Sequence, residues 1–123
     1  MGGLLAELFE HFGIRTNTQT VQGSFCDGRY NLAAAGRKIA GTAQHWQRDQ
    51  SAANRYRVLS HAVILAADPA MLTERANRFE QALGSATHYR ADKTTSLLEL
   101  AGAGGAASLA ALQTIIKTHH TIN

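Results

Sequence analysis

The residues of this chain best suited to chemistry are its single cysteine, Cys26, and a lysine twelve positions later, Lys38. A cysteine attacks an acyl carbon as the thiolate, so it needs a nearby base or cation that favours loss of its proton. Lys38 is the best helper at hand, because arginine does not exchange a proton near neutral pH. A partly desolvated lysine has a lowered pKa and serves in general base and acid work, or supports a carboxyl or phosphoryl oxygen electrostatically. We therefore expect the thiol and the amine to meet at one cleft.

Both residues also have an ordinary structural interpretation. A lone cysteine is often a small buried hydrophobe, and a lysine on a strand often points into solvent. Cys26, however, lies in a loop between Gly23 and Gly28, where the backbone is free to approach a ligand closely. Lys38 stands among alanines and glycines, including Gly41, which favour a surface against which a ligand lies.

A hairpin is the element expected to position this pair. Residues 32–35 form a short apolar run, Gly36 and Arg37 mark a turn, and residues 39–43 resume the extended pattern. Before the hairpin we expect a helix at 4–12 that ends at Gly13 and an extended segment at 16–21, and after it a polar turn at 49–54 and a strand at 56–66 that is covered on both faces. A helix should then begin with Asp68 as N-cap and Pro69 as its first residue, end at Gly84, and carry an apolar stripe at Leu72, Ala76, Phe79 and Leu83. The last expected elements are a short helix at 96–101, a glycine break at 102–105 and a helix at 106–119. This order predicts an α+β fold, with helices packed on one side of a mostly antiparallel sheet.

Composition and charge bound the class of protein. A chain of 123 residues is long enough for one domain, and it contains no apolar run that would span a bilayer. The first residues carry Glu7 and Glu10 without the basic segment of a signal peptide, and one cysteine forms no internal disulfide, so we expect a cytoplasmic protein. The net charge of +3 fits a mildly basic protein or an acidic carrier partner. Nucleic-acid binding is weakly supported, because no aromatic side chains interleave with the arginines at 48–57.

The histidines do not indicate a metal site. None of the six pairs with another histidine, a cysteine or a carboxylate at the spacing that metal ligation needs. We therefore expect no metal ion.

The segment around the lysine resembles a known family. Tyr-Asn-Leu at 30–32, followed by Gly-Arg-Lys-Ile-Ala-Gly-Thr-Ala-Gln at 36–44, is similar to the lysine motif of the lipoate–protein ligase and octanoyltransferase family, which is related in fold to biotin–protein ligases. The preceding Ser-Phe-Cys-Asp-Gly at 24–28 resembles the cysteine loop of the members that transfer octanoyl or lipoyl groups through a thioester, at the same distance before the lysine. A looser resemblance runs through His61-Ala-Val-Ile-Leu and Asn77-Arg-Phe-Glu to about Leu100.

Two departures from the family pattern stand out. The aspartate that is common in the first of these motifs is Asn31 here. Family catalytic domains are also longer, and their first half carries an Arg-Arg-x-x-Gly-Gly segment and a histidine that complete the acyl pocket. The resemblance therefore implies that residues 1–123 are a single domain equivalent to the C-terminal half of such a catalytic domain, with the N-terminal half absent.

The resemblance also implies a reaction and its participants. Octanoyl or lipoyl groups would be transferred to the lysine of lipoyl domains, with Cys26 as acyl carrier and Lys38 managing the proton. The substrate-binding positions would be Gly28, Tyr30, Asn31, Gly36, Gly41 and Thr42. No tightly bound cofactor is implied, since the octanoyl or lipoyl group is a substrate. The implied partners are lipoyl domains of 2-oxoacid dehydrogenases or the glycine-cleavage H protein, acyl carrier protein, and a missing N-terminal half or a second copy, with neither nucleic acid nor membrane.

Two other functions remain open. In the first, ATP-dependent ligation proceeds through an acyl-adenylate, with Lys38 on the activated carboxyl and Cys26 as a bystander. In the second, the chain is a noncatalytic module that binds a lipoyl carrier and has lost the reaction.

Overall fold

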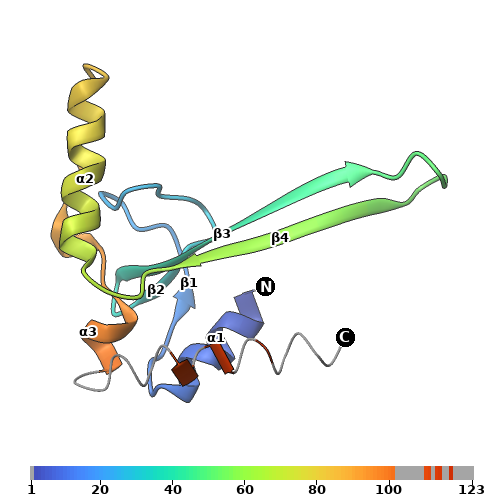
Figure 1. Ribbon diagram of the computed structural model, residues 1–123, viewed down its shortest axis with the longest axis horizontal. Helices are drawn as coiled ribbons and strands as arrows, with labels where there is room; N and C mark the ends of the chain where they lie inside the picture. Colours follow the sequence, from blue (N-terminus) through green and yellow to red (C-terminus); the bar gives the residue numbers. More distant parts are fainter. Residues whose placement is uncertain (1, 102–109, 112, 115–116, 118–123) are drawn as a thin grey trace.

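The computed structural model of this chain describes residues 2–101, 110, 111, 113, 114 and 117. Its elements in chain order are α1 (Gly2–His11), β1 (Asn17–Thr18), β2 (Leu32–Ala34), β3 (Arg37–Arg48), β4 (Tyr56–Ile64), α2 (Pro69–Ala82), a 3-10 turn η1 (Ala91–Lys93) and α3 (Leu97–Ala101). The strands form an antiparallel sheet in the order β1-β2-β3-β4 (Figure 1). The expected α+β fold class is thereby confirmed. The expected break at 102–105 and most of the expected helix at 106–119 lie outside the described residues.

The core forms where α1 packs against the short end of the sheet. Leu5, Leu8 and Phe9 lie on one stripe of α1 and are buried. Gly13 ends the helix with a φ of 74°, and the Ile14 N–H then donates to the Phe9 carbonyl at 3.0 Å. The sheet and α3 complete this core with Leu32, Ala34, Ile39, Ala40 and Leu97. The helix expected at 4–12 is therefore present and ends where the glycine predicts.

The β2–β3 turn consists of two residues. Ala34 pairs with Arg37, so the turn residues are Ala35 and Gly36, with φ angles of 50° and 76°. Positive φ at both positions is the type I′ geometry whose twist matches that of the flanking strands. The expected hairpin is confirmed, but its turn lies one residue earlier than predicted, because Arg37 already belongs to β3.

A bulge in β3 places Lys38 and Gly41 on the same face of the sheet. Leu32 pairs with Ala40 and Ala33 with Lys38, so Ile39 is an extra residue on β3. A bulge of this kind shifts the alternation of side chains by one position. Ile39 and Ala40 consequently both enter the core. Lys38 is left on the opposite face of the sheet.

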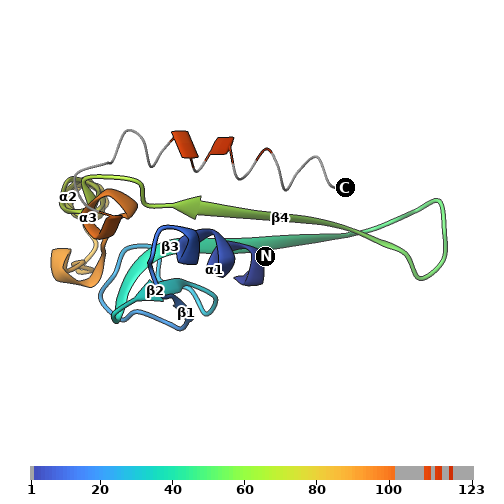
Figure 2. The ribbon, with the colours of Figure 1, turned by 90° about the horizontal axis from the view of Figure 1, so that it is seen from below.

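Beyond this bulge, β3 and β4 continue as a long two-stranded arm that projects from the rest of the molecule (Figures 1 and 2). Within the described part of the chain, β4 pairs only with β3. Leu59 and Val63 are therefore 62% and 64% exposed, and Val58 is exposed as well. The strand predicted at 56–66 is confirmed, but the prediction that both its faces are covered is wrong. The apolar run reflects β-branched strand residues and does not report burial.

The long helix α2 stands at the end of the sheet opposite the arm tip (Figure 1). It begins at Pro69 as expected, and Asp68 occupies the N-cap position, but with a φ of 51° its side chain makes no capping hydrogen bond. The prediction that an apolar stripe forms the packed face of this helix is wrong, because Phe79 and Leu83 are exposed. The packed side is instead polar, with Thr73 buried on α2.

The side chain of Ser96 caps the start of the short helix α3. The Glu99 N–H donates to the Ser96 Oγ at 3.1 Å, as the Ser-x-x-Glu spacing favours. None of the helices among the described residues is long and apolar enough to cross a membrane.

Candidate functional site

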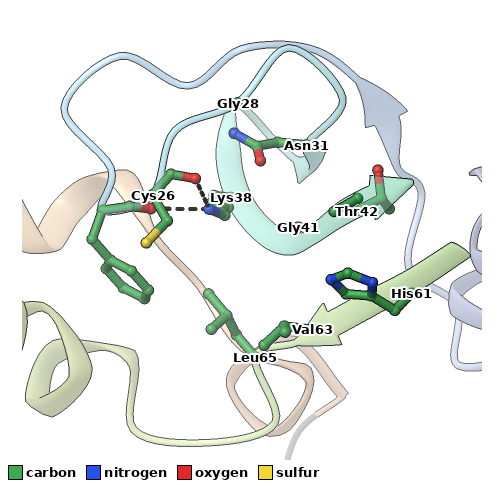
Figure 3. Close-up of a pocket in the computed structure, with 11 residues that line it drawn as sticks. Cys26, Gly28, Asn31, Lys38, Gly41, Thr42, His61, Val63 and Leu65 are labelled. Atoms are coloured by element: carbon green, nitrogen blue, oxygen red, sulfur yellow. Dashed lines mark hydrogen bonds between the residues drawn. The ribbon is translucent and has the colours of Figure 1, made fainter. Parts of the chain in front are cut away.

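A cavity of about 250 Å³ lies where the loop that carries Cys26 meets the base of the arm (Figure 3). The loop contributes one wall, β3 the floor, and β4 the far side. Its lining residues are Phe25, Cys26, Gly28, Asn31, Lys38, Gly41, Thr42, Ala43, His61, Val63 and Leu65. The structure thus places the cysteine and the lysine singled out in the sequence in the walls of one cavity.

The thiol of Cys26 is free and exposed. Its residue has a φ of 48°, in the left-handed region that non-glycine residues rarely occupy. Figure 3 shows the side chain turned toward the space above Val63 and Leu65. An accessible sulfur beside an apolar wall is suited to carry an acyl chain that lies along that wall.

Hydrogen bonds on both sides of Cys26 hold the loop in this conformation. The Asp27 Oδ1 accepts from the Val21 N–H at 2.8 Å and from the Asn31 Nδ2 at 2.7 Å. The Ser24 Oγ donates to the Val21 carbonyl at 2.8 Å. Since Ser24 and Asn31 are each only 2% exposed, these bonds are shielded from competing water.

The Lys38 amine is tied to the backbone of the same loop. Nζ donates to the carbonyls of Phe25 and Cys26 at 2.9 and 2.6 Å, and it lies 5.5 Å from the centre of the Phe25 ring. The lysine's own carbonyl accepts from the Thr95 N–H at 2.8 Å, which fixes its backbone. The amine of Lys38 therefore contacts the backbone carbonyl of Cys26, and its hydrogen bonds hold the cysteine loop against β3.

Burial lowers the pKa of the Lys38 amine. Desolvation lowers the pKa of the amine from its ordinary value of 10.5, while the nearby Cys26 and Asp27 partly oppose that shift. A larger fraction of neutral amine is then present near neutral pH than for a lysine in water. This is the property that proton transfer at the site requires.

The residues expected to bind substrate divide into two groups. Gly28, Asn31, Gly41 and Thr42 line the cavity. Tyr30 is exposed, and its carbonyl accepts a hydrogen bond from the Thr42 Oγ1 at 2.8 Å. Gly36 lies in the β2–β3 turn. Neither Gly36 nor Tyr30 is among the residues that line the cavity.

Gly41 keeps the floor of the cavity open. A Cβ at this position would lie 3.6 Å from the Lys38 Nζ and 3.8 Å from the Asn31 Oδ1. These are ordinary contact distances, so a side chain would fit the fold but would occupy the space between the two polar groups.

Five further residues line the cavity without a role predicted from the sequence, namely Phe25, Ala43, His61, Val63 and Leu65. His61 and Val63 come from β4, where they pair with Ala43 and Gly41 and so share the cavity face. The alternation within β4 places His61 and Val63 on one face, but the register with β3 is needed to identify that face. Across the described residues, no group of three histidine, cysteine, aspartate or glutamate side chains is placed to hold a metal ion.

Comparisons with known proteins give two relatives, while no family model matches the chain. The chain is 46% identical over 114 residues to an uncharacterised protein of Cupriavidus necator, a match that covers 85% of this chain and 45% of that protein. It is 40% identical over 98 residues to an octanoyl-GcvH:protein N-octanoyltransferase of Kyrpidia tusciae, which covers 76% of this chain and 34% of that protein. The chain thus spans less than half the length of these curated relatives. The second match supports a relationship to the octanoyltransferases.

Proposed function

We propose that this chain carries the thioester-forming site of an acyltransferase that moves an octanoyl group onto an amine of a protein. The observation that carries this proposal is the placement of an accessible thiol, Cys26, and a buried amine, Lys38, in the walls of one small cavity. The similarity to a protein named as an octanoyltransferase supports the choice of acyl group.

In the first half of the reaction, the Cys26 thiolate attacks the carbonyl carbon of an octanoyl thioester. The donor thiol leaves and the acyl group remains on the cysteine sulfur. Lys38 has two of its three substituent positions committed to the carbonyls of Phe25 and Cys26. The third position holds a proton in the ammonium form and a lone pair in the amine form, so it is the one that exchanges protons.

The cavity offers a place for a short acyl chain. Phe25, Val63 and Leu65 supply apolar lining beside the sulfur. The volume of about 250 Å³ is below the range of roughly 300–1,000 Å³ that is usual for drug-sized ligands. A single chain of medium length is the ligand that this size favours.

The proposed acceptors are lysines of lipoyl domains, and the proposed donors are octanoyl thioesters or octanoylated carriers such as the one in the name of the Kyrpidia relative. The chain's net charge of +3 is compatible with an acidic carrier.

Mass spectrometry tests this function directly. We expect wild-type protein incubated with octanoyl-N-acetylcysteamine to gain one octanoyl group at Cys26, in a form that hydroxylamine removes. Lys38→Met should slow this acylation by at least tenfold. A matched control is Lys93→Met, which removes a lysine that does not line the cavity.

Three outcomes would contradict the thioester route. An adduct of equal yield on Cys26→Ala would show that the cysteine is not the carrier. ATP-dependent transfer of free octanoate by Cys26→Ala would identify the adenylate route. Absence of any adduct, together with binding of a lipoyl domain in calorimetry, would identify a noncatalytic module.

A further inference from the structure

The side chain of Asn31 presents a hydrogen-bond acceptor to the cavity. Asn31 is 2% exposed, and its Nδ2 donates to the Asp27 Oδ1 at 2.7 Å. A carboxylate only accepts hydrogen bonds, so the amide nitrogen must face Asp27 and the amide oxygen must face away from it. Figure 3 shows this oxygen directed into the cavity.

No described residue donates a hydrogen bond to this oxygen. It lies 3.8 Å from the position of a Cβ at either Gly28 or Gly41, and the Lys38 Nζ lies 3.6 Å from that same point at Gly41. Asn31 Oδ1 and Lys38 Nζ therefore border one recess, floored by Gly41. Lys38 keeps one position free of the loop carbonyls. The recess thus offers one hydrogen-bond acceptor, Asn31 Oδ1. It also offers the remaining position on Lys38 Nζ, which donates a hydrogen bond when Lys38 is protonated.

We propose that this recess is the subsite for the attacking amine, in which Asn31 Oδ1 accepts an N–H of the acceptor nitrogen while Lys38 Nζ faces the carbonyl oxygen. The inference rests on the proposed function and extends it to how the nucleophile is held. Asn31 Oδ1 only accepts hydrogen bonds and faces the cavity without a donor among the described residues, so the N–H of an incoming amine is a partner that it can bind. A hydrogen bond formed inside the cavity is partly shielded from competing water.

The step balances without a further reactant. The neutral amine attacks the thioester carbon, the C–N bond forms, and the C–S bond breaks with its electron pair on the Cys26 sulfur. The proton lost by nitrogen passes through Lys38 to that sulfur. The products are an amide and the free thiol of Cys26.

A ligand pair that differs in one N–H tests the subsite without requiring catalysis. N-methyloctanamide has the shape of the product amide, and methyl octanoate has the same shape with oxygen in place of N–H. In calorimetric titration we expect wild-type protein to bind the amide about tenfold more tightly than the ester, as one hydrogen bond allows. Asn31→Leu should remove this preference.

A matched control separates a contact from a general effect on the loop. Ser24→Ala deletes another buried hydrogen bond of the same loop, outside the cavity, and should preserve the preference for the amide. If Asn31→Leu does not fold, the Asn31 side-chain carbonyl resonance of wild-type protein supplies the readout. It should shift with N-methyloctanamide and remain in place with methyl octanoate.

The remaining outcomes overturn the inference. Equal binding of the two ligands to wild-type protein, no binding of either, or a preference that persists in Asn31→Leu would each reject the subsite. An octanoyl adduct on Cys26 without the amide preference would reject the subsite alone. A preserved preference with no adduct would reject the thioester reaction and leave the amide-recognising recess standing.

Discussion

At the scale of single residues, the site is arranged around the amine of Lys38. Its hydrogen bonds to the carbonyls of Phe25 and Cys26 hold the cysteine loop against β3. The residue is only 4% exposed, so those bonds form in a partly desolvated environment where they are stronger than in water. The same burial lowers the pKa of the amine, so one side chain organises the loop and is prepared for proton transfer.

The lowered pKa of Lys38 predicts a pH dependence of stability. The unfolded chain binds this proton more tightly than the folded one, so between the lowered pKa and 10.5 the unfolded state holds more protons. The free energy of unfolding therefore rises with pH through that window. We expect urea denaturation to show this rise in wild-type protein and a flatter profile in Lys38→Met. Parallel profiles for the two proteins would refute the linkage.

Gly41 makes a second prediction at this scale. Gly41→Ala would place a methyl group 3.6 Å from the Lys38 Nζ, a contact that the fold accommodates. We expect the free energy of unfolding to change by less than about 1 kcal/mol, while octanoylation of Cys26 slows by at least tenfold. Gly3→Ala is the control, since nothing lies within 4 Å of its added Cβ. Equal acylation rates in both variants would contradict this role of Gly41 in acylation.

At the scale of elements, the hairpin of β2 and β3 brings the site together. Its two-residue turn sets the register that pairs Lys38 with Ala33, and the extra residue Ile39 then brings Gly41 onto the same face as Lys38. The segment after η1 reinforces this arrangement, because Thr94 forms a parallel bridge with Lys38 and the Thr95 N–H donates to the lysine carbonyl. The position of the Lys38 amine is thus determined by the β2–β3 hairpin, by the cysteine loop and by the segment at Thr94 and Thr95.

The turn can be stabilised by a single substitution. Ala35 has a φ of 50°, which strains a residue with a Cβ, whereas asparagine tolerates this region and Asn-Gly is the preferred type I′ pair. We expect Ala35→Asn to raise the free energy of unfolding by about 0.5–1 kcal/mol and Gly36→Ala to lower it by at least as much. Chemical denaturation monitored by circular dichroism measures both. A destabilised Ala35→Asn would contradict the turn geometry.

At the scale of the whole molecule, the described part of the chain consists of a packed body and a two-stranded arm. The cavity lies at their junction, so β4 contributes lining residues at its base while its distal half is exposed on both faces (Figure 2). A hairpin without a third strand is marginally stable in water. The single tryptophan, Trp46, is 60% exposed on this arm, packed edge-on against Tyr56.

Hydrogen exchange should separate these two parts. We expect the amides of residues 44–48 and 56–60 to exchange at least tenfold faster than those of residues 39–42 and 62–64. Among the described residues, Ala62 and Ile64 at the base pack against the core, whereas none of residues 44–48 or 56–60 belongs to it. Peptide-resolved exchange measured by mass spectrometry checks this. Uniform protection along β3 and β4 would contradict the arm as a separate unit.

The sequence by itself determined the features that depend on the backbone of one residue or on neighbours in the chain. Gly13 ends α1, Pro69 begins α2, and the hairpin turn falls within one residue of its predicted place, because φ preferences act locally. The short hairpin also led us to expect Cys26 near Lys38, and hydrogen bonds from Lys38 to the carbonyls of Phe25 and Cys26 complete that placement.

Only the tertiary structure decided the features that depend on register and long-range packing. The bulge at Ile39, the contribution of His61 from β4 and the direction of the Asn31 oxygen all require contacts between segments distant in the chain. The apolar pattern of β4 predicted burial, but several of its apolar side chains are exposed in the structure. Apolar side chains show that a strand is able to pack against a neighbour, and only the tertiary structure shows whether a neighbour is present. The cysteine and the lysine were visible in the sequence, whereas the cavity that they share exists only once the core has set the register of the strands.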